Sequence, residues 1–408
     1  MNVTIVGAGI GGLTLALQLH RVGIDCRVVE AVDEIAGIGV GINVLPHAMR
    51  ILADLDVDTA LAGAGVVTRE SVFFNRFGQL VHREPCGTLA GFDHPQVSIH
   101  RGDLQKVLLD AVLDRLGPDR VHTGHRCVGL TEDESGVDVQ VDTAGGARTF
   151  RADVLVGCDG IHSVVRRHLH PDEGAPVYSG INMWRGTTRG KPFLSGASMV
   201  RAGWFTTGKL VVYPIRDDVD AEGNQLLNWV VEIETPRHAT RDWNRRGRLA
   251  DFVDAFADWT FDWLDVPAMF RSSETILEYP MVDQEPLDRW SFGRVTLLGD
   301  AAHPMVPRGS NGAGQAIVDS EVLGQALAAA TDPAAALAAY EAERLPATAE
   351  VVRMNRTNPP DAILREVWQR TGDRPFTTIE DVISEHELAE IADRYRKITG
   401  AARSGDGT

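Results

Sequence analysis

The chain has 408 residues, and 57 acidic against 40 basic residues give it a net charge of −17 at pH 7. This balance argues against a nucleic-acid or anionic-membrane partner, and no apolar run reaches the roughly 20 residues that span a bilayer. The four cysteines form no CxxC pair, so we expect reduced thiols and no metal site. A strand predicted from residue 2 leaves no room for a cleaved signal peptide. Together these features predict a soluble cytoplasmic α/β enzyme.

The first thirty residues follow a strand, turn, helix, strand pattern. A β-branched strand over Asn2–Val6 runs into the turn Gly7–Gly12, a helix follows over Leu13–Val22, and a second strand ends on Glu30. The first glycine permits a sharp turn, the glycine at position 9 lets the backbone approach a pyrophosphate, and the last lets the helix pack on the strand. The helix N-terminus offers N–H groups to phosphates, and Glu30 can accept hydrogen bonds from both ribose hydroxyls. The pattern predicts a dinucleotide site.

Two features between residues 31 and 116 have two interpretations each. The glycines of the loop Ala36–Asn43 keep its backbone open to a flat ligand, but a merely flexible loop explains them equally well. A helix is predicted from Pro46, and the strand Gln96–Ile99 leads into another helix that ends near residue 116. Arg101 lies just before that helix, where a cation is not needed to stabilise an N-terminus. It is either a phosphate-binding arginine or a surface arginine.

The middle of the chain is richer in strands. The pattern predicts a hairpin over Val72–Val81 and a small antiparallel layer with strands at residues 122–128, 137–141 and 149–156. Strands over residues 178–235 form a half-buried sheet suited to covering a cavity. Tyr213 in this sheet either lines a pocket or packs in the core. Arg248–Trp263 has aromatic residues at helical spacing, which predicts a helix used for core packing.

Two buried strands each end in an aspartate beside a glycine. The strand Val154–Val156 runs into Asp159 and Gly160, and Ser163 is a good N-cap for a following helix. Ligands of α/β proteins bind at such strand ends, although Asp-Gly also occurs in ordinary turns. The strand at residues 294–298 delivers Gly299 and Asp300. The loop Pro307–Gly314 then offers backbone N–H groups at the start of a long Ala/Leu-rich helix.

The last sixty residues are predicted to be a helical extension. A second helix runs over Pro333–Glu350, and Asn358–Pro360 marks a break. The charged tail Asp361–Ile398 is predicted to be helical and to pack on the body or on a second subunit. Residues 401–408 are expected to be disordered. His303, which follows the Gly-Asp pair, is better explained as a packed histidine than as a base.

The three motifs taken together resemble those of the single-component FAD-dependent aromatic hydroxylases, the p-hydroxybenzoate hydroxylase-like flavoprotein monooxygenases. The resemblance covers residues 1 to about 350. Within that family, the stretches MWRG at 183–186, DWNRRGRL at 242–249 and YPMVD at 279–283 are most similar to phenazine-modifying monooxygenases. The implied fold is α/β, with a Rossmann-like FAD-binding domain, an inserted, mostly antiparallel substrate sheet and a C-terminal helical tail.

The resemblance also implies domain boundaries. Residues 1–71, 97–175 and 285–350 would form the FAD-binding domain, and residues 72–96 and 176–284 the substrate domain. Residues 351–408 would form the helical tail. Only one GxGxxG-type site is present, so NADH or NADPH is expected to visit transiently. This argues against the monooxygenases that have two dinucleotide sites, and the absence of a WxWxIP stretch argues against a flavin halogenase.

The resemblance further implies roles for individual residues along the cofactor. For the FAD pyrophosphate and the adenosine it implies Gly9, Gly11, Gly12, Glu30 and the main chain at Val128. For the ribityl chain and phosphate it implies Arg101 and Asp300, with Asp159 serving both flavin and nicotinamide. For the isoalloxazine ring it implies Val40, Gly41, Pro307, Asn311 and Gly312. Pro307 and Tyr213 are candidate substrate contacts.

The implied chemistry belongs to the cofactor. Reduced flavin reacts with O2 to give a C4a-hydroperoxide, which transfers OH to a planar aromatic or N-heteroaromatic ring, and the protein supplies position and a dry site. No catalytic triad is expected, and the protein would be a monomer or a homodimer. An FAD-dependent reductase without oxygenation, or a non-catalytic flavin-binding module, are the alternatives. Two departures from relatives stand out: Gly314 replaces a frequent asparagine, and the 37–43 loop lacks an arginine that some relatives carry.

Overall fold

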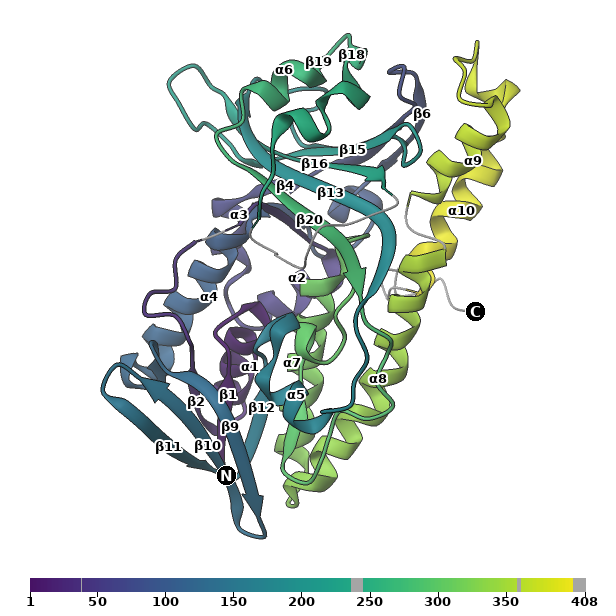
Figure 1. The fold of residues 1–408 in the computed structure, drawn as a ribbon. Helices are drawn as coiled ribbons and strands as arrows, with labels where there is room; N and C mark the ends of the chain where they lie inside the picture. Colours follow the sequence, from purple (N-terminus) through teal and green to yellow (C-terminus); the bar gives the residue numbers. More distant parts are fainter. Residues whose placement is uncertain (38, 236–244, 358–360, 399–408) are drawn as a thin grey trace.

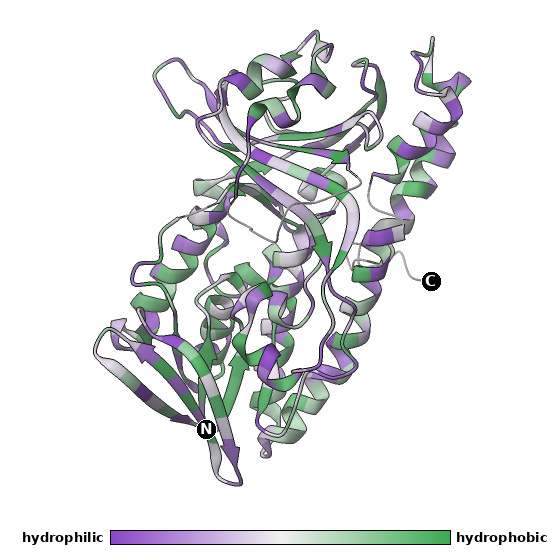
Figure 2. Cartoon of the chain, viewed as in Figure 1, coloured by the Kyte–Doolittle hydropathy of each residue, from purple (hydrophilic) through white to green (hydrophobic). Residues whose placement is uncertain are grey.

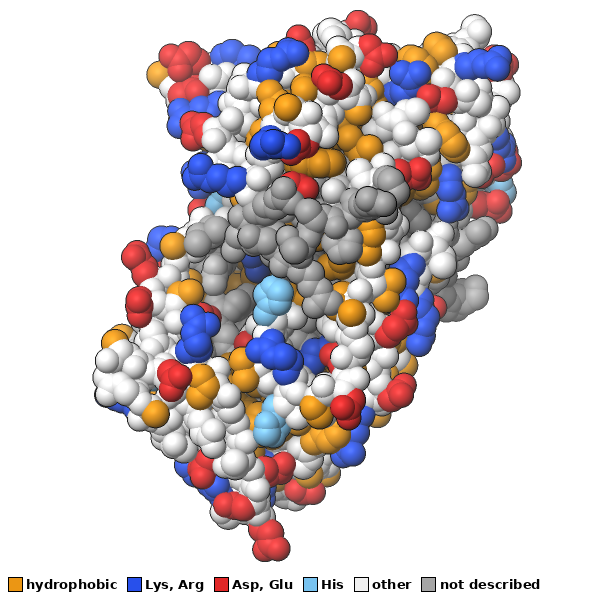
Figure 3. Space-filling model, in the orientation of Figure 1, with side chains coloured by type: hydrophobic (Ala, Val, Ile, Leu, Met, Phe, Trp, Pro, Cys, Tyr) orange, Lys and Arg blue, Asp and Glu red, His pale blue; other side chains and the backbone are white. Residues whose placement is uncertain are grey.

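The computed structural model describes residues 1–37, 39–235, 245–357 and 361–398. Figure 1 shows two stacked bodies, a parallel sheet with its helices below and a large antiparallel sheet above, with the C-terminal helices along one side. Among these described residues, no helix is long and apolar enough to cross a bilayer. Acidic and basic side chains are interspersed over the face shown in Figure 3.

A five-stranded parallel sheet forms the centre of the lower body. Its strand order is β21-β12-β1-β2-β8, and its side chains are mostly buried because helices and a small antiparallel layer pack against it. The hydrophobic colouring of these strands is visible in Figure 2. The strands are β1 (Asn2–Val6), β2 (Asp25–Val29), β8 (Val121–His122), β12 (Val154–Gly157) and β21 (Val295–Leu297). The sheet therefore joins three distant segments of the chain.

Helix α1 (Ile10–Arg21) contacts the two longer helices of this body, α4 (Arg101–Leu116) and α7 (Asn311–Ala329). The short helix α5 (Val164–Leu169) follows the 3-10 turn η3 (Gly160–His162). These bounds confirm the predicted strand–turn–helix pattern at the N-terminus and the predicted helices that begin near residues 101 and 163. The long helix expected after the loop Pro307–Gly314 is also present, but it begins earlier, at Asn311. The carboxyl ends of β1, β12 and β21 consequently lie at one edge of the sheet, each followed by a predicted motif.

A small antiparallel layer differs from its prediction at both ends. It has the order β11-β10-β9, with β9 at Arg126–Asp133, β10 at Gly136–Thr143 and β11 at Gly146–Ala152. The predicted strand at 149–156 is in fact two strands, because the apolar Val154–Gly157 joins the parallel sheet. The predicted strand at 122–128 is divided in the same way, since His122 pairs with β2.

The large sheet is antiparallel apart from the β14–β5 pair, and its order is β17-β20-β13-β16-β15-β14-β5-β6. Its strands are β5 (Glu70–Phe74), β6 (Leu80–Pro85), β13 (Val177–Gly190), β14 (Ser198–Trp204), β15 (Gly208–Arg216), β16 (Gln225–Glu234), β17 (Arg245–Arg246) and β20 (Ile276–Asp283). The predicted hairpin and the predicted strands between residues 178 and 235 are confirmed. The sheet has an outer face and an inner face, and the inner face is turned toward the lower body (Figure 1).

The predicted helix over residues 248–263 is wrong, although its packing role is right. This segment forms two 3-10 turns, η4 (Leu249–Asp251) and η5 (Val253–Phe256), and the short strands β18 (Thr260–Phe261) and β19 (Leu264–Asp265), before helix α6 (Val266–Arg271). Its aromatic side chains are buried against Trp229 and its neighbours on the outer face of the large sheet. Tertiary packing therefore overrides a spacing that resembles a helix.

A three-stranded sheet connects the two bodies. Its order is β3-β7-β4, with β3 at Gly41–Val44, β7 at Gln96–His100 and β4 at Val66–Thr68. Helices α2 (Pro46–Ala53) and α3 (Asp58–Ala64) lie between β3 and β4 in the sequence, and β7 contacts β15 of the large sheet. The predicted helix from Pro46 is confirmed. Part of the Ala36–Asn43 loop is thus a strand at the junction of the two bodies.

The chain ends in helices α8 (Pro333–Thr357), α9 (Ala362–Thr371) and α10 (Glu385–Ile398). Helix α8 extends beyond its predicted end and contains Pro346. The buried side chains of Ile363 and Val367 belong to an apolar cluster with Phe73 and Met183 of the large sheet. Of the two predicted packing modes, the tail therefore packs on the body. The predicted break at Asn358–Pro360 and the predicted disordered end lie outside the described residues.

Candidate functional site

The glycine turn contains two glycines that the fold itself requires. Gly7 has φ +106°, a conformation that side chains rarely adopt, and a Cβ there would overlap the carbonyl oxygen of Cys158. A Cβ on Gly12 would overlap the carbonyl oxygen of Gly7, well inside the 3.0 Å that real Cβ atoms keep. These two glycines allow β1, α1 and the β12 end to approach one another. Their task in this structure is packing.

Gly9 and Gly11 face different surroundings. A Cβ on Gly11 would lie 2.7 Å from Leu298 Cδ2 and 3.3 Å from the Cβ of Ala316, so this glycine lets α1 pack against α7. A Cβ on Gly9 would touch nothing within 4 Å. Gly9 is also the N-cap of α1, in an extended conformation and without a side-chain cap. The helix N-terminus is therefore open for an anion to approach its N–H groups.

The Glu30 carboxylate is fixed beside this turn. Its Oε2 accepts a hydrogen bond from the Ala8 N–H at 2.8 Å, and its Oε1 accepts one from the Val32 N–H at 3.1 Å. Each carboxylate oxygen can accept more than one hydrogen bond, so both can still receive hydroxyl donors. The open turn and the oriented carboxylate fit the pyrophosphate and the adenosine ribose of a dinucleotide.

The Asp159 carboxylate organises its own turn. It accepts hydrogen bonds from Ser163 Oγ at 2.5 Å and from the Val164 N–H at 2.6 Å. Burial raises the pKa of Asp159, and these hydrogen bonds oppose that effect. Ser163 Oγ accepts from the Arg166 N–H at 2.8 Å, which confirms the predicted N-cap. Asp159 therefore has at least one structural role of its own, because its hydrogen bonds fix the start of α5.

Arg166 connects the second motif to the third. Its guanidinium is buried, and Nη1 donates to the carbonyl oxygens of Ala301 and Ala302 at 2.8 Å each. Its Nε and Nη2 bind the Glu173 carboxylate at 2.7 and 2.6 Å. Arg166 thereby fixes the main chain that immediately follows Asp300. The sequence indicated that Arg166 belongs to a motif, but no nearby residues could have predicted that it binds Ala301 and Ala302.

Asp319, which the sequence analysis did not single out, holds the same turn from the other side. Its carboxylate is 0% exposed and accepts hydrogen bonds from the Gly299 N–H at 3.2 Å, His303 Nε2 at 2.6 Å and Arg344 Nε at 2.7 Å. Burial alone would raise the pKa of Asp319, but attraction to His303 and Arg344 holds it below its usual range. His303 is confirmed as a packed histidine. An aspartate inside an apolar helix is the one sequence signal that pointed to this role.

The third motif brings Asp300 to the first turn of α7. Asp300 is exposed, and its Oδ1 would lie 3.7 Å from a Cβ on Gly312. Ser310 adopts φ +60° before the helix begins at Asn311, whose side-chain amide donates to the Arg308 carbonyl oxygen at 3.3 Å. Pro307 is exposed. The structure therefore brings together the predicted contacts of the third motif.

The 40–41 segment contacts both bodies. The Arg101 N–H donates to the Val40 carbonyl oxygen at 3.0 Å, which places the exposed Arg101 side chain at the start of α4 beside this loop. The Gly41 N–H donates to Asn228 Oδ1 at 2.7 Å, and Arg185 Nη2 donates to the Gly41 carbonyl oxygen at 2.8 Å. A Cβ on Gly41 would lie 2.6 Å from the Cβ of Asn228. Gly41 is thus fastened to the large sheet by its backbone.

Val128 lies on β9, away from this junction. The pairing of β9 with β10 shifts register there, so that Val128 has no residue directly opposite it, and its side chain is 47% exposed. Burial raises the pKa of the neighbouring Cys127 thiol to about 11, with a further contribution from Asp159. Val128 is therefore near the second motif.

Register defines the inner face of the large sheet. One row across the strands contains Arg185, Val230, Val211 and Arg201, and the next row on the same face contains Asn228, Tyr213 and Met199. Tyr213 is buried, which raises its pKa, while the nearby arginines at positions 185 and 201 oppose that rise. Burial supports the core interpretation of Tyr213, but its position beside Arg185 and Asn228 also places it at the edge of the junction.

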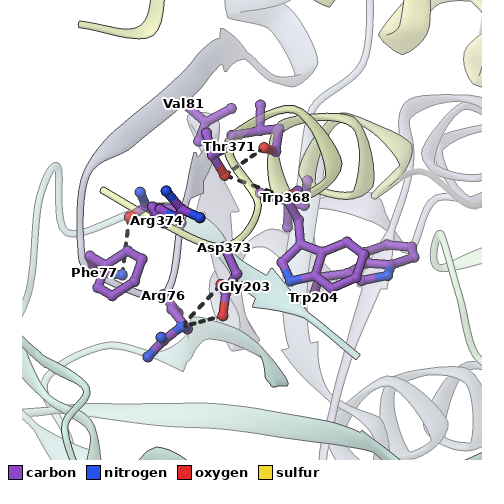
Figure 4. A pocket seen from close by; sticks show the side chains of 12 residues that line it. Arg76, Phe77, Val81, Gly203, Trp204, Trp368, Thr371, Asp373 and Arg374 are labelled. Carbon is purple, nitrogen blue, oxygen red and sulfur yellow. Dashed lines mark hydrogen bonds and ion pairs between the residues drawn. The ribbon is translucent and has the colours of Figure 1, made fainter. Parts of the chain in front are cut away.

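A separate small pocket lies between the β5–β6 hairpin and α9. Figure 4 shows Arg76 paired with Asp373 at one side of it and the indole rings of Trp204 and Trp368 at the other. This pocket shares no residue with the three motifs. It belongs to the seam along which the tail packs on the body.

Comparison with known proteins accounts for this arrangement. The family described as FAD binding domain matches residues 1–185 and 264–355. The chain is 43% identical to the phenazine 1,6-dicarboxylic acid hydroxylase of Lysobacter antibioticus over 97% of both proteins, and 34% identical to a 3-amino-4-hydroxybenzoate 2-monooxygenase of Streptomyces platensis over 93% of both.

A solved structure shows the same fold. Klebsiella pneumoniae HpxO, crystallised with FAD and uric acid, superposes with a TM-score of 0.74 at 26% identity, and the match covers 98% of this chain and 93% of that protein. The open turn at Gly9 and the oriented Glu30 carboxylate therefore lie in a fold that binds FAD. The chain belongs to the FAD-dependent aromatic hydroxylases, flavoprotein monooxygenases that hydroxylate aromatic or heteroaromatic substrates and typically take electrons from NAD(P)H.

Proposed function

We propose that this enzyme hydroxylates a phenazine carboxylic acid. The observation that carries the proposal is the 43% identity, over 97% of both chains, to a hydroxylase whose substrate is phenazine 1,6-dicarboxylic acid. The inner face of the large sheet supports it, because apolar Val211 and Val230 lie in one row with Arg185. Such a surface suits a planar ring that carries a carboxylate.

The proposed cofactor contacts follow the three motifs. Gly9 would admit the FAD pyrophosphate to the α1 N-terminus, and Glu30 would accept hydrogen bonds from the adenosine ribose, with the main chain at Val128 beside the adenine. Arg101 and Asp300 would bind the phosphate and ribityl region. For Gly11 and Gly12 the packing contacts described above explain the glycine, so we propose that they shape the turn for the ligand.

The remaining proposed contacts surround the flavin ring. The Val40–Gly41 backbone would flank it on one side, and Pro307 with the amides at Asn311 and Gly312 would lie on the other, at the positive end of the α7 dipole. Asp159 would keep its turn in place for flavin and nicotinamide. Bound FAD supplies the redox chemistry with O2. The protein residues position the substrate ring and exclude water from it.

We also propose which segments of the chain bind FAD and which bind the substrate. Residues 1–71, 97–175 and 285–350 would bind FAD, while residues 72–96 and 176–284 would bind the substrate. The sheet memberships support this division, since the parallel strands fall in the first group and the strands of the large sheet, apart from Glu70 and Ser71, in the second.

The test is turnover with labelled O2. The purified holoenzyme is expected to oxidise NADH or NADPH faster when phenazine 1,6-dicarboxylic acid is added, and to place one labelled oxygen atom in the product. Unlabelled product would refute a monooxygenase reaction. Labelled product from a benzoate, with no stimulation by any phenazine acid, would refute the phenazine assignment alone.

A further inference from the structure

Arg308, next to Pro307, is a buried arginine whose charge is incompletely paired. Its residue is 6% exposed, and its guanidinium lies over the Phe205 ring with 4.7 Å to the ring centroid. Nη1 donates to the Asn355 carbonyl oxygen at 3.1 Å. Nε and Nη2 are buried, and neither has a hydrogen-bond partner within the described part of the chain.

Those two nitrogens form the edge with which an arginine binds a carboxylate side-on. Two other arginines use the same pair of nitrogens to bind a carboxylate. Arg166 donates from Nε and Nη2 to Glu173, and Arg356 donates from Nε and Nη2 to Asp283 at 2.8 and 2.9 Å. Within the described part of the chain, Glu232 is the one carboxylate in ion-pair range of Arg308, with its Oε2 3.8 Å from Nε. That distance is too long for a hydrogen bond, so the bidentate edge of Arg308 is vacant.

The surrounding charges do not balance. Arg308, Lys209 and Arg201 are three cations, and Glu232 and Asp361 are two anions. Lys209 Nζ binds Glu232 Oε1 at 2.9 Å and also pairs with Asp361, and Arg201 Nε lies 3.1 Å from Asp361 Oδ1. Counted over these five described residues, the cluster carries one excess positive charge. A buried charge is costly unless it is paired and hydrogen-bonded, and one carboxylate would satisfy both needs.

The cluster lies on the face that we assign to the substrate. Along β16, the residues on the inner face are Asn228, Val230 and Glu232. The apolar Val230 therefore lies between two polar residues. At about 3.3 Å per residue, Asn228 and Glu232 are about 13 Å apart. Met183, which pairs with Glu232 across the strands, is buried in the apolar cluster that also contains Val230 and Ile363 of α9.

The other end of this stripe also contains donors. Asn228 Nδ2 and Arg185 Nε are buried, and neither makes a hydrogen bond of good geometry among the described residues, although the Tyr213 hydroxyl lies within reach of both side chains. The Arg185 guanidinium has no carboxylate within ion-pair distance in the same set of residues, although its Nη2 holds Gly41. Hydrogen-bond donors at both ends of an apolar stripe are complementary to a planar acid with a carboxylate at each end.

We propose that Arg308 is the receptor for one carboxylate of a planar aromatic diacid, whose other carboxylate binds at Arg185 and Asn228. This inference rests on the proposed function, because it assumes that the inner face holds the aromatic substrate. Arg308 then selects a diacid over a monoacid. The ring lies over Val230 between the two carboxylate sites.

The experiment compares two acids and three variants of the FAD-loaded full-length enzyme. Phenazine 1,6-dicarboxylic acid and phenazine-1-carboxylic acid are titrated while the flavin absorbance is recorded, which measures binding without turnover. Arg308→Lys keeps the charge but removes the bidentate edge, and Arg308→Gln removes both. Arg120→Gln removes an exposed arginine paired with Asp25 on the lower body and is the control.

Arg308→Lys is expected to bind the diacid about tenfold more weakly, which is about 1.4 kcal/mol, and to bind the monoacid like the wild type. FAD occupancy measured by absorbance shows whether Arg308→Gln has folded, and the lysine variant keeps the test decisive if it has not. Equal losses for both acids, or no loss for either, would overturn the role of Arg308. If the wild type binds the diacid preferentially but does not hydroxylate it, the proposed function fails while the receptor stands; if it binds neither acid, both fail.

Discussion

Replacing Gly9 and Gly12 separately with alanine tests whether one glycine serves the cofactor and the other serves the fold. At Gly9 a Cβ would touch nothing within 4 Å, and the backbone is extended with φ −74°. Alanine restricts the unfolded chain, which stabilises by about 0.4–1 kcal/mol, but it is a poorer N-cap than glycine by a similar amount. The free energy of unfolding of the apoprotein should therefore change by less than about 1 kcal/mol. FAD affinity should fall at least about tenfold, because the added methyl lies where the pyrophosphate approaches.

At Gly12 the same substitution acts on the fold. The new Cβ would overlap the Gly7 carbonyl oxygen, and both groups are main chain, so neither can rotate away. Overpacking costs about 1–3 kcal/mol and more where nothing can move, so we expect a loss of at least about 3 kcal/mol. For a unit of roughly 150–250 residues, such a loss lowers Tm by about 6–12 °C.

Calorimetry of the apoproteins and quenching of FAD fluorescence measure the two effects independently. Gly63→Ala is the control, since Gly63 lies in α3 with nothing within 4 Å of its added Cβ. A Gly9→Ala protein that binds FAD like the wild type would refute the cofactor role. A Gly12→Ala apoprotein with unchanged Tm would refute the packing argument.

Three further outcomes follow from buried groups. Asp319→Asn should lower the free energy of unfolding by about 3–5 kcal/mol, because the Arg344 guanidinium stays buried without its counter-charge; urea unfolding measures this, and a loss below about 1 kcal/mol would contradict it. Burial and nearby arginines lower the pKa of His47 to about 4, from 6.5 when unfolded. Neutral His47 therefore stabilises fully above pH 6.5, and about 3 kcal/mol is lost as the pH falls to 4; His47→Gln should flatten that part of the stability curve, and an unchanged slope would count against it. Burial raises the pKa of the Cys26 thiol to about 12, so iodoacetamide at pH 8 should label it only after unfolding, and rapid labelling of the native protein would show that it is accessible.

Local chemistry explains what the sequence could predict. The turn from β1 to α1, the Ser163 N-cap and the strand before Asp300 each depend on a few adjacent residues, and each was located correctly. The predicted core packing of the aromatic side chains at 248–263 is likewise confirmed. Its helix was wrong because the same spacing also satisfies two 3-10 turns whose aromatic side chains pack on the large sheet.

Long-range partners could not be predicted in this way. Arg166 and Asp319 hold the Gly299–His303 turn from opposite sides, across separations that the sequence does not reveal. Arg308 was passed over for the same reason, since its vacant edge is visible only when Glu232 and Asn355 are placed around it. The residues missed by the sequence analysis are thus those that act through partners on other elements.

Gly41 shows how the structure decides between two explanations of one residue. The glycines of its loop suggested either room for a flat ligand or mere flexibility, yet the Gly41 backbone is bonded to Asn228 and Arg185 on two strands of the large sheet. A flexible loop would not keep both hydrogen bonds, and any side chain at this position would collide with Asn228. Gly41 is therefore a fixed point between the two bodies. Because the same two side chains lie at one end of the apolar stripe, a carboxylate bound there would be coupled through Gly41 to the segment that we assign to the flavin ring.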